Sequence, residues 1–315
     1  MKIPLAAVLV SACLAQSPTA NSQPPTANSQ LTMAHVQANI YVLMGDGGNI
    51  TVQIGKDGVA MVDTGFAPLA PRAMAEIRKL SDGPVRWIVN THVHGDHTGG
   101  NAEIAKLGMT RESIGAPRIV AQSNVLNRMT SPAPGQPKIP EAAWPNDEYF
   151  TPTKDFYFNG EAVIVSHVPN AHTDGDSLVY FRKSDVLATG DVFTPEHYPF
   201  LDLARGGSVQ GEIDALNKII DITVPAKYQE GGTVVIPGHG RLCDEADVVE
   251  YRNMLTIVRD RFQAMIKQGM SFEQIKAAKP TLDYDTQYSA GIVTTDKFVE
   301  AVYKSLTEAQ KEAKK

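Results

Sequence analysis

Short apolar runs separated by glycine-rich turns dominate the first part of the chain. Three such runs follow one another at Ile40–Met44, Ile50–Ile54 and Val59–Val62, with the turn sequences GDGG and KDG between them. Runs rich in β-branched residues and bounded by Gly and Asp are typical of strands joined by tight connections. The pattern therefore predicts three consecutive strands.

Further along, strand-like runs alternate with stretches of helical periodicity. Strands are expected at Val85–Val89, Val163–Val168, Leu178–Phe181, Val186–Ala188 and Val234–Ile236, and helices at Pro68–Leu80, Ile213–Ile220, Val248–Lys267, Phe272–Ala278 and near the C-terminus. The proline-rich stretch from Ser131 to Pro145 is expected to be an irregular loop, long enough to act as a lid. The alternation predicts one α/β catalytic domain.

The N-terminal segment has the pattern of a targeting sequence. An apolar run from Ile3 to Val10 follows Lys2 and is too short to span a bilayer, as in a secretory signal. Two kinds of processing stay open for residues 1–15: lipidation of Cys13, since VSAC resembles a lipobox, or signal cleavage near Ala15. We expect export to the periplasm, with membrane contact only through such a lipid.

Residues 16–33 have the composition of a polar tether. The heptapeptide SPTANSQ at 17–23 recurs as PPTANSQ at 24–30, without a large apolar side chain that could build a core. We therefore expect the catalytic domain to occupy residues 34–315. The second cysteine, Cys243, is expected to be a free, buried or half-buried thiol.

Composition excludes several classes of protein. The 315 residues are 43% hydrophobic and 20% charged, with 2 Cys and a net charge of −6. These values rule out a small disulfide-stapled protein, a collagen and a wholly disordered chain. A nucleic-acid partner is not expected because there is neither a basic excess nor a basic stripe. The expected partner is a small-molecule substrate.

Imidazoles and carboxylates are concentrated directly after one predicted strand. The segment NTHVHGDHTGG, residues 90–100, contains His92, His94, Asp96 and His97. Neutral imidazole is the commonest zinc ligand, and Asp adds a hard oxygen donor. A purely structural cluster would be costly to bury. A strand-to-helix turn can aim alternate residues to opposite sides, so His92 and His94 are expected to bind one ion and Asp96 and His97 a neighbouring ion.

Three more ligand-type residues follow later strands. The segment AHTDGDS contains His172, TGD contains Asp191 and PGHG contains His239. A lone His beside Gly is usually only a turn residue, so each segment by itself is a weak signal. Together with the cluster, and in this order, they predict a common metal site where neighbouring strands converge.

In this order the residues resemble the HxHxDH … H … D … H series of the metallo-β-lactamase superfamily, over about residues 35–250. The resemblance implies a four-layer αβ/βα sandwich with two Zn²⁺ in the cleft at the sheet edges. It assigns His92, His94 and His172 to the first ion, Asp96, His97 and His239 to the second, and Asp191 to a bridge between them. It also places Asp63 beside the site, as a residue that orients a ligand.

The resemblance implies a dinuclear zinc hydrolase whose shared hydroxide opens an acyl bond in a β-lactam, lactone, ester or thioester. Asp96 is expected to be catalytic too, as a proton shuttle. Glyoxalase-II-type thioesterases and lactonases share the Asp bridge, whereas β-lactam-hydrolysing members often carry Cys or Ser at position 191. Iron or manganese is an alternative to zinc. The alternative function is a mononuclear iron oxidoreductase of the persulfide dioxygenase type.

Five nearby residues have two readings each. His197 and Tyr198 either line the pocket or belong to an ordinary loop. Arg205 either binds a substrate carboxylate or is a solvated cation. Trp144 and Phe150 either roof the cleft or anchor the proline-rich loop to the core.

Overall fold

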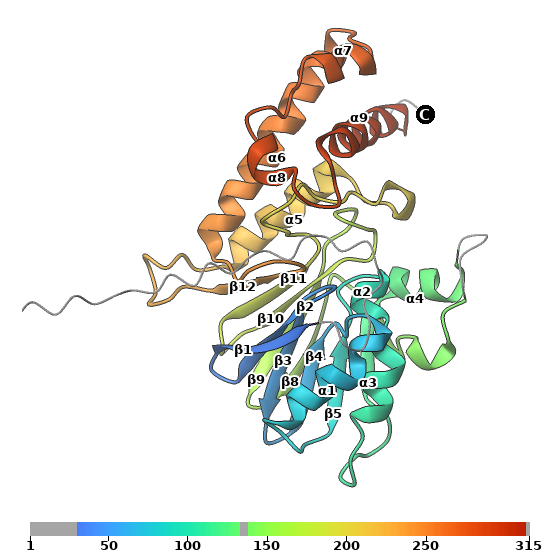
Figure 1. Ribbon diagram of the computed structural model, residues 1–315, viewed down its shortest axis with the longest axis vertical. Coiled ribbons are helices and arrows are strands. Elements are labelled where there is room, and N and C mark those ends of the chain that lie inside the picture. The colour runs from blue at the N-terminus through green and yellow to red at the C-terminus, as the bar shows by residue number, and fades with distance from the viewer. Residues whose placement is uncertain (1–29, 133–137, 313–315) are drawn as a thin grey trace, which may run out of the picture.

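The computed structural model describes residues 30–132 and 138–312, which form two sheets with helices on their outer faces (Figure 1). The first sheet has the strand order β1-β2-β3-β4-β5-β6-β7, antiparallel from β1 to β4 and parallel from there to β7. Its strands are β1 (Leu31–Gln37), β2 (Ile40–Gly45), β3 (Ile50–Gly55), β4 (Gly58–Val62), β5 (Val85–Val89), β6 (Arg118–Gln122) and β7 (Asp147–Tyr149).

The second sheet has the order β12-β11-β10-β9-β8 and is antiparallel except for the parallel pair β11 and β12. Its strands are β8 (Thr153–Phe158), β9 (Glu161–His167), β10 (Ser177–Phe181), β11 (Val186–Gly190) and β12 (Val234–Pro237). The helices are α1 (Ala70–Arg78), α2 (Gly95–Thr98), α3 (Asn101–Leu107), α4 (Ser123–Thr130), α5 (Val209–Ile222), α6 (Glu245–Lys267), α7 (Phe272–Ala277), α8 (Asp285–Tyr288) and α9 (Thr295–Glu312).

Three apolar clusters hold the layers together. Residues such as Val62 and Val89 of the first sheet pack against Val165 and Val179 of the second, which forms the central layer of the core. A second cluster joins the first sheet to α1 and α3, and a third joins the second sheet to α5, α6 and α9. Burial of both faces of each sheet explains why the central strands read as nearly continuous apolar runs. The expected αβ/βα sandwich is confirmed.

The strands expected from the sequence are present, but the boundaries differ in places. β1 begins at Leu31, inside the segment expected to be a tether, because Leu31 is buried and pairs with Gly45 of β2. The strands β1, β6, β7 and β8 and the helices α3, α4 and α8 were not expected. The targeting segment, Cys13 and nearly all of the repeat lie outside the described residues, as does 133–137 of the proline-rich loop. Within the part of the chain that is described, no helix is both long and apolar enough to cross a membrane.

Candidate metal centre

The residues of the expected metal site lie at the carboxyl ends of strands from both sheets. Asp63 follows β4, the segment 92–97 follows β5, Asp191 follows β11 and His239 follows β12. Because β4 and β5 are parallel neighbours, as are β11 and β12, the segments after each pair leave the sheet at the same edge. The backbone N–H of Ser177, at the start of β10, donates to the carbonyl oxygen of Thr91 at 2.8 Å, which joins the segment after β5 to the second sheet.

The first ligand group contains three imidazoles and one carboxylate. His94 Nδ1 lies 3.1 Å from His92 Nε2 and 2.9 Å from His172 Nε2. Asp191 Oδ2 lies 3.9 Å from His92 Nε2 and 3.7 Å from His172 Nε2. All four ligand atoms lie within 4.8 Å of one another, a spacing that a single cation could fill.

The second ligand group contains Asp96, His97 and His239. Asp96 Oδ2 lies 3.2 Å from His239 Nε2 and 3.7 Å from His97 Nε2. Asp191 also reaches this group, through its other oxygen: Oδ1 lies 3.0 Å from His97 Nε2 and 3.4 Å from His239 Nε2. The carboxylate of Asp191 therefore has one oxygen on each group.

Unsatisfied buried atoms indicate that the two groups are built for cations. His97 Nε2 and Asp191 Oδ1 are both buried, and neither forms a hydrogen bond. A buried polar atom without a partner costs about 1–3 kcal/mol, so native proteins rarely leave one unexplained. Both atoms are strong metal donors, and a bound cation would satisfy both. The residues present thus fit a two-metal centre.

Burial controls protonation in the first group. It lowers the pKa of His172 to about 4, and that of His92 well below its usual value. The imidazoles of His97 and His172 lower the pKa of His92 further. Both His92 and His172 are therefore neutral at pH 7, which is the state in which imidazole binds a metal.

Carboxylates reverse this effect in the second group. Burial is the largest single effect and again disfavours charged imidazoles, but the charges and hydrogen bonds of Asp191 and Asp96 together outweigh it. They raise the pKa of His239 to about 9 and, with the charge of Asp63, that of His97 well above its usual value. Burial would raise the pKa of Asp96, yet His97 and His239 lower it to about 2. The second group therefore pairs its carboxylates with imidazoles that hold protons at pH 7, and a cation would have to displace those protons.

In His92, His94, His97 and His172, the ring nitrogen that points away from the centre has a hydrogen-bond partner. His97 Nδ1 donates to Asp63 Oδ2 at 2.7 Å, and His172 Nδ1 donates to the carbonyl oxygen of Phe200 at 2.5 Å. His94 Nε2 donates to Asp202 Oδ2 at 2.8 Å. Because a carboxylate or carbonyl oxygen accepts, each imidazole turns an N–H toward it, and the other ring nitrogen faces the centre.

His92 is oriented through a short relay. Thr91 Oγ1 donates to Asp63 Oδ2 at 2.7 Å and lies 3.0 Å from His92 Nδ1, so the imidazole can only donate to it. Asp63 thus orients His92 as well as His97, and it adopts the left-handed region with a φ of 62°. The sequence pointed to Asp63 as an orienting residue.

Sequence reasoning missed Asp202 and two glycines. Asp202 also accepts from Arg205 Nη1 at 2.6 Å, so Arg205 pairs with Asp202 while its side chain stays 37% exposed to solvent. Gly48 and Gly238 allow the backbone to pass close to the centre. An added Cβ would lie 2.4 Å from His97 Cε1 at the first and 2.0 Å from Asp191 Oδ1 at the second.

The remaining candidates take other places. Tyr198 is buried in the core, where its hydroxyl donates to Asp285 Oδ1 at 2.8 Å and its ring stacks on Phe298. It therefore does not line the site. Trp144 anchors its own loop, since Nε1 donates to the carbonyl oxygen of Ile139 at 3.0 Å. Phe150 is 83% exposed.

The fold and the centre together define an αβ/βα sandwich with a histidine-rich, metal-binding site at the sheet edges. The family model of the metallo-beta-lactamase superfamily matches residues 43–239, more than half of the chain. This chain belongs to the metallo-β-lactamase superfamily, as the resemblance implied.

A curated relative matches a shorter region. A linear primary-alkylsulfatase from a Pseudomonas species is 36% identical over 78 residues, which is 24% of this chain and 14% of that protein. The chain therefore shares only one part of that relative.

Solved structures share the fold at low sequence identity. The sec-alkylsulfatase Pisa1 from Pseudomonas sp. has a TM-score of 0.68 at 18% identity, covering 87% of this chain and 50% of that one. A metallo-beta-lactamase from Pontibacter korlensis has a TM-score of 0.57 at 17% identity, covering 72% of this chain and 99% of that one. This chain thus spans about half the length of the alkylsulfatase and nearly the full length of the metallo-beta-lactamase.

Proposed function

We propose that the chain is a dinuclear zinc hydrolase that opens an acyl bond in a β-lactam, lactone, ester or thioester. The observation that carries this proposal is the position of Asp191, whose Oδ2 faces the first ligand group and whose Oδ1 faces the second. Imidazoles with carboxylates suit zinc, and iron or manganese is the alternative. Two such cations would supply a water of lowered pKa and polarise the scissile carbonyl.

The protein's own residues hold and orient that chemistry. Each of these imidazoles turns an N–H toward Asp63, Asp202, Thr91 or a carbonyl, so its inner nitrogen points toward the centre. The side chain of Asp96 is 22% exposed and that of Asp191 12%. Because solvent reaches Asp96 more easily, we assign to Asp96 the transfer of a proton between the centre and solvent.

The second ligand group distinguishes this proposal from the mononuclear iron oxidoreductase. A single-ion enzyme would use His92, His172 and Asp191 and would leave Asp96, His97 and His239 without a role. Yet these three lie within 4.8 Å of one another, with a buried, unpartnered nitrogen on His97. A complete second group favours two ions, and with them hydrolysis.

Hydrolysis of a sulfate ester is the second candidate. It is favoured by the similarity to a linear primary-alkylsulfatase and to the sec-alkylsulfatase Pisa1. A dinuclear centre can activate water for attack on either kind of ester, because in both reactions negative charge develops on oxygens next to the cations. The two candidates therefore differ in substrate and share the same ligands.

An activity assay with protein of known zinc content tests both proposed activities. The purified full chain is stripped with a chelator, reloaded with zinc, and offered a chromogenic cephalosporin, a γ-lactone, a nitrophenyl ester, an acyl thioester and a nitrophenyl sulfate. Zinc-dependent turnover of an acyl substrate is expected. Turnover of the sulfate alone would replace the first candidate by the second. No turnover at two zinc ions per chain would contradict both.

We also propose that the enzyme works in the periplasm, on the basis of the apolar segment from Ile3 to Val10. Cell fractionation tests this: the chain is expected in the periplasmic or membrane fraction, and recovery in the cytoplasm would contradict it. Labelling with a fatty acid in the wild type and in Cys13→Ser separates the lipidated form from the soluble form.

A further inference from the structure

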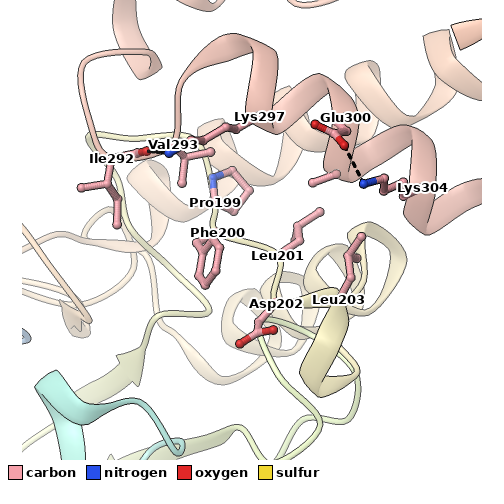
Figure 2. Close-up of a pocket in the computed structure, with 11 residues that line it drawn as sticks. Pro199, Phe200, Leu201, Asp202, Leu203, Ile292, Val293, Lys297, Glu300 and Lys304 are labelled. Carbon is pink, nitrogen blue, oxygen red and sulfur yellow. Dashed lines mark hydrogen bonds and ion pairs between the residues drawn. The ribbon is translucent and has the colours of Figure 1, made fainter. Parts of the chain in front are cut away.

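A groove of about 420 Å³ lies between the loop that follows β11 and the C-terminal helix α9 (Figure 2). This volume is within the range of about 300–1,000 Å³ that is typical of small-molecule sites. Its walls are mostly apolar, and the residues that matter here are Phe200, Leu201, Leu203, Ile292, Val293 and Ala301.

The groove begins beside the metal centre. Figure 2 shows Leu201 and Leu203 pointing toward α9, whereas Phe200 and Asp202 point to the opposite side of the loop. On that side, the ring of Phe200 lies 5.9 Å from the ring of His94 and 5.8 Å from the ring of His172, measured between centroids. One short loop therefore forms both the edge of the centre and the wall of the groove.

Large apolar side chains in the lining of the groove are exposed. Phe200 is 48% exposed and Ile292 is 70% exposed, although each is flanked by buried neighbours, Leu201 and Val293. Exposed apolar side chains that gather around a hollow are typical of a binding site. A ligand that covered them would gain the free energy of apolar burial.

The charged residues along the groove already have partners. Lys304 pairs with Glu300 at 2.5 Å, and Lys297 Nζ donates to the carbonyl oxygen of Ile292 at 3.3 Å. Asp202 is held by His94 and Arg205. The groove therefore favours an apolar occupant over a charged one.

The shape of the groove favours an elongated occupant. Four of its lining residues, at positions 297, 300, 301 and 304, lie along one face of α9. Seven residues of an α-helix span ~10 Å, so the groove follows two turns of α9. An alkyl chain matches this length and these walls better than a compact ring does.

We propose that this groove binds an alkyl tail of the substrate, which makes the substrate class an acyl compound with a long apolar chain. This inference rests on the proposed function, because the tail is placed by the scissile bond at the metal centre. Phe200, Ile292 and Ala301 then determine specificity by contact with the tail.

Calorimetric titration of the zinc-loaded full chain with butyrate, hexanoate, octanoate and decanoate tests the proposal without turnover. Affinity is expected to rise with chain length, by up to about fourfold for each buried methylene. The heat capacity of binding is expected to become more negative along the series, as apolar burial requires.

Two matched substitutions locate the tail. Ala301→Phe fills the groove and is expected to abolish the gain in affinity with chain length. Ala277→Phe makes the same change on the exposed face of α7, away from the groove, and is expected to leave that gain unchanged. If Ala301→Phe does not fold, Ile292→Ser at an exposed position takes its place and is expected to reduce the gain.

An affinity that does not depend on chain length overturns the proposal, as does a chain-length gain that survives the groove variants. Failure of the proposed function is recognised separately, because it concerns turnover of short acyl substrates at two zinc ions per chain. Turnover of short substrates without any effect of chain length would leave the hydrolase in place and remove the tail site.

Discussion

The two ligand groups of the metal centre use the same kinds of side chain but hold protons very differently. In the first group, burial lowers the pKa of His172 to about 4. In the second group burial also acts to lower the pKa of His239, but several effects, led by the charge of Asp191, together raise it to about 9. On the side that faces the centre, the first group has the carboxylate of Asp191, whereas the second has those of both Asp96 and Asp191. The first is therefore ready to bind a cation, while the second must exchange protons for one.

Asp191→Ala is expected to have the largest effect because Asp191 serves both groups. Removing it takes one oxygen from each ion, so we expect loss of both zinc ions and a fall of turnover to the background rate. Zinc is measured per folded chain by atomic emission, together with circular dichroism to check the fold. Asp214→Ala, at an exposed carboxylate on α5, is the matched control and should retain two ions. Two zinc ions bound to Asp191→Ala would show that the bridge is not needed.

The number of protons released on metal binding is expected to differ between the two ligand groups, which is the second largest effect. At pH 7 His97 and His239 carry protons, so loading the second group should release up to two protons, whereas His92 and His172 are already neutral. Lowering the pH from 9 to 6 should weaken binding to the second group by up to ~100-fold per pH unit, which follows from two protons at 1.4 kcal/mol each. In the first group, His92 and His172 should not compete with the metal for protons until pH approaches 4.

Calorimetry in buffers of different ionisation enthalpy measures these protons for each binding step. Equal release at both steps would contradict the asymmetry. The mutant His239→Ala provides the control, since it should remove one proton from the second step and none from the first.

The elements that could be predicted from the sequence are those with a distinctive run of apolar residues within the element itself. The strands β3, β4 and β9 to β12 read as apolar runs because both faces of the sheets are buried. The strand β6 has only three apolar residues between Arg118 and Gln122, and β7 has only the residues Asp147–Tyr149, so neither has a long apolar run of its own. These two are strands because of their neighbours in the sheet.

The same distinction applies to the site. The seven candidate ligands were found because they follow strands beside Gly or within one dense motif; their role as ligands remains a prediction. Asp202 was missed because it lies in an irregular loop and reaches His94 across 108 positions of sequence. Ile292 and Ala301 come still later in the chain, and only the packing of α9 beside the loop brings them to the groove.

The carboxylates that hydrogen-bond to the candidate ligands, Asp202 and Asp63, allow the two ligand groups to be perturbed separately. Asp202 holds His94 of the first group, whereas Asp63 holds His97 of the second and, through Thr91, His92 of the first. Substitution of such an orienting residue usually reduces metal affinity by about 10–100-fold. We expect Asp202→Asn to weaken only the first site, because its contacts do not reach the second.

Asp63→Asn should weaken both sites, with the greater effect on the second, where its hydrogen bond to the ligand is direct. Asn tolerates the left-handed backbone at position 63, so the change tests the hydrogen bonds and not the turn. Competition with a chromogenic zinc chelator gives the two affinities for each variant. Equal loss at both sites in Asp202→Asn would mean that the two ions are coupled through Asp191 so tightly that the groups act as one site.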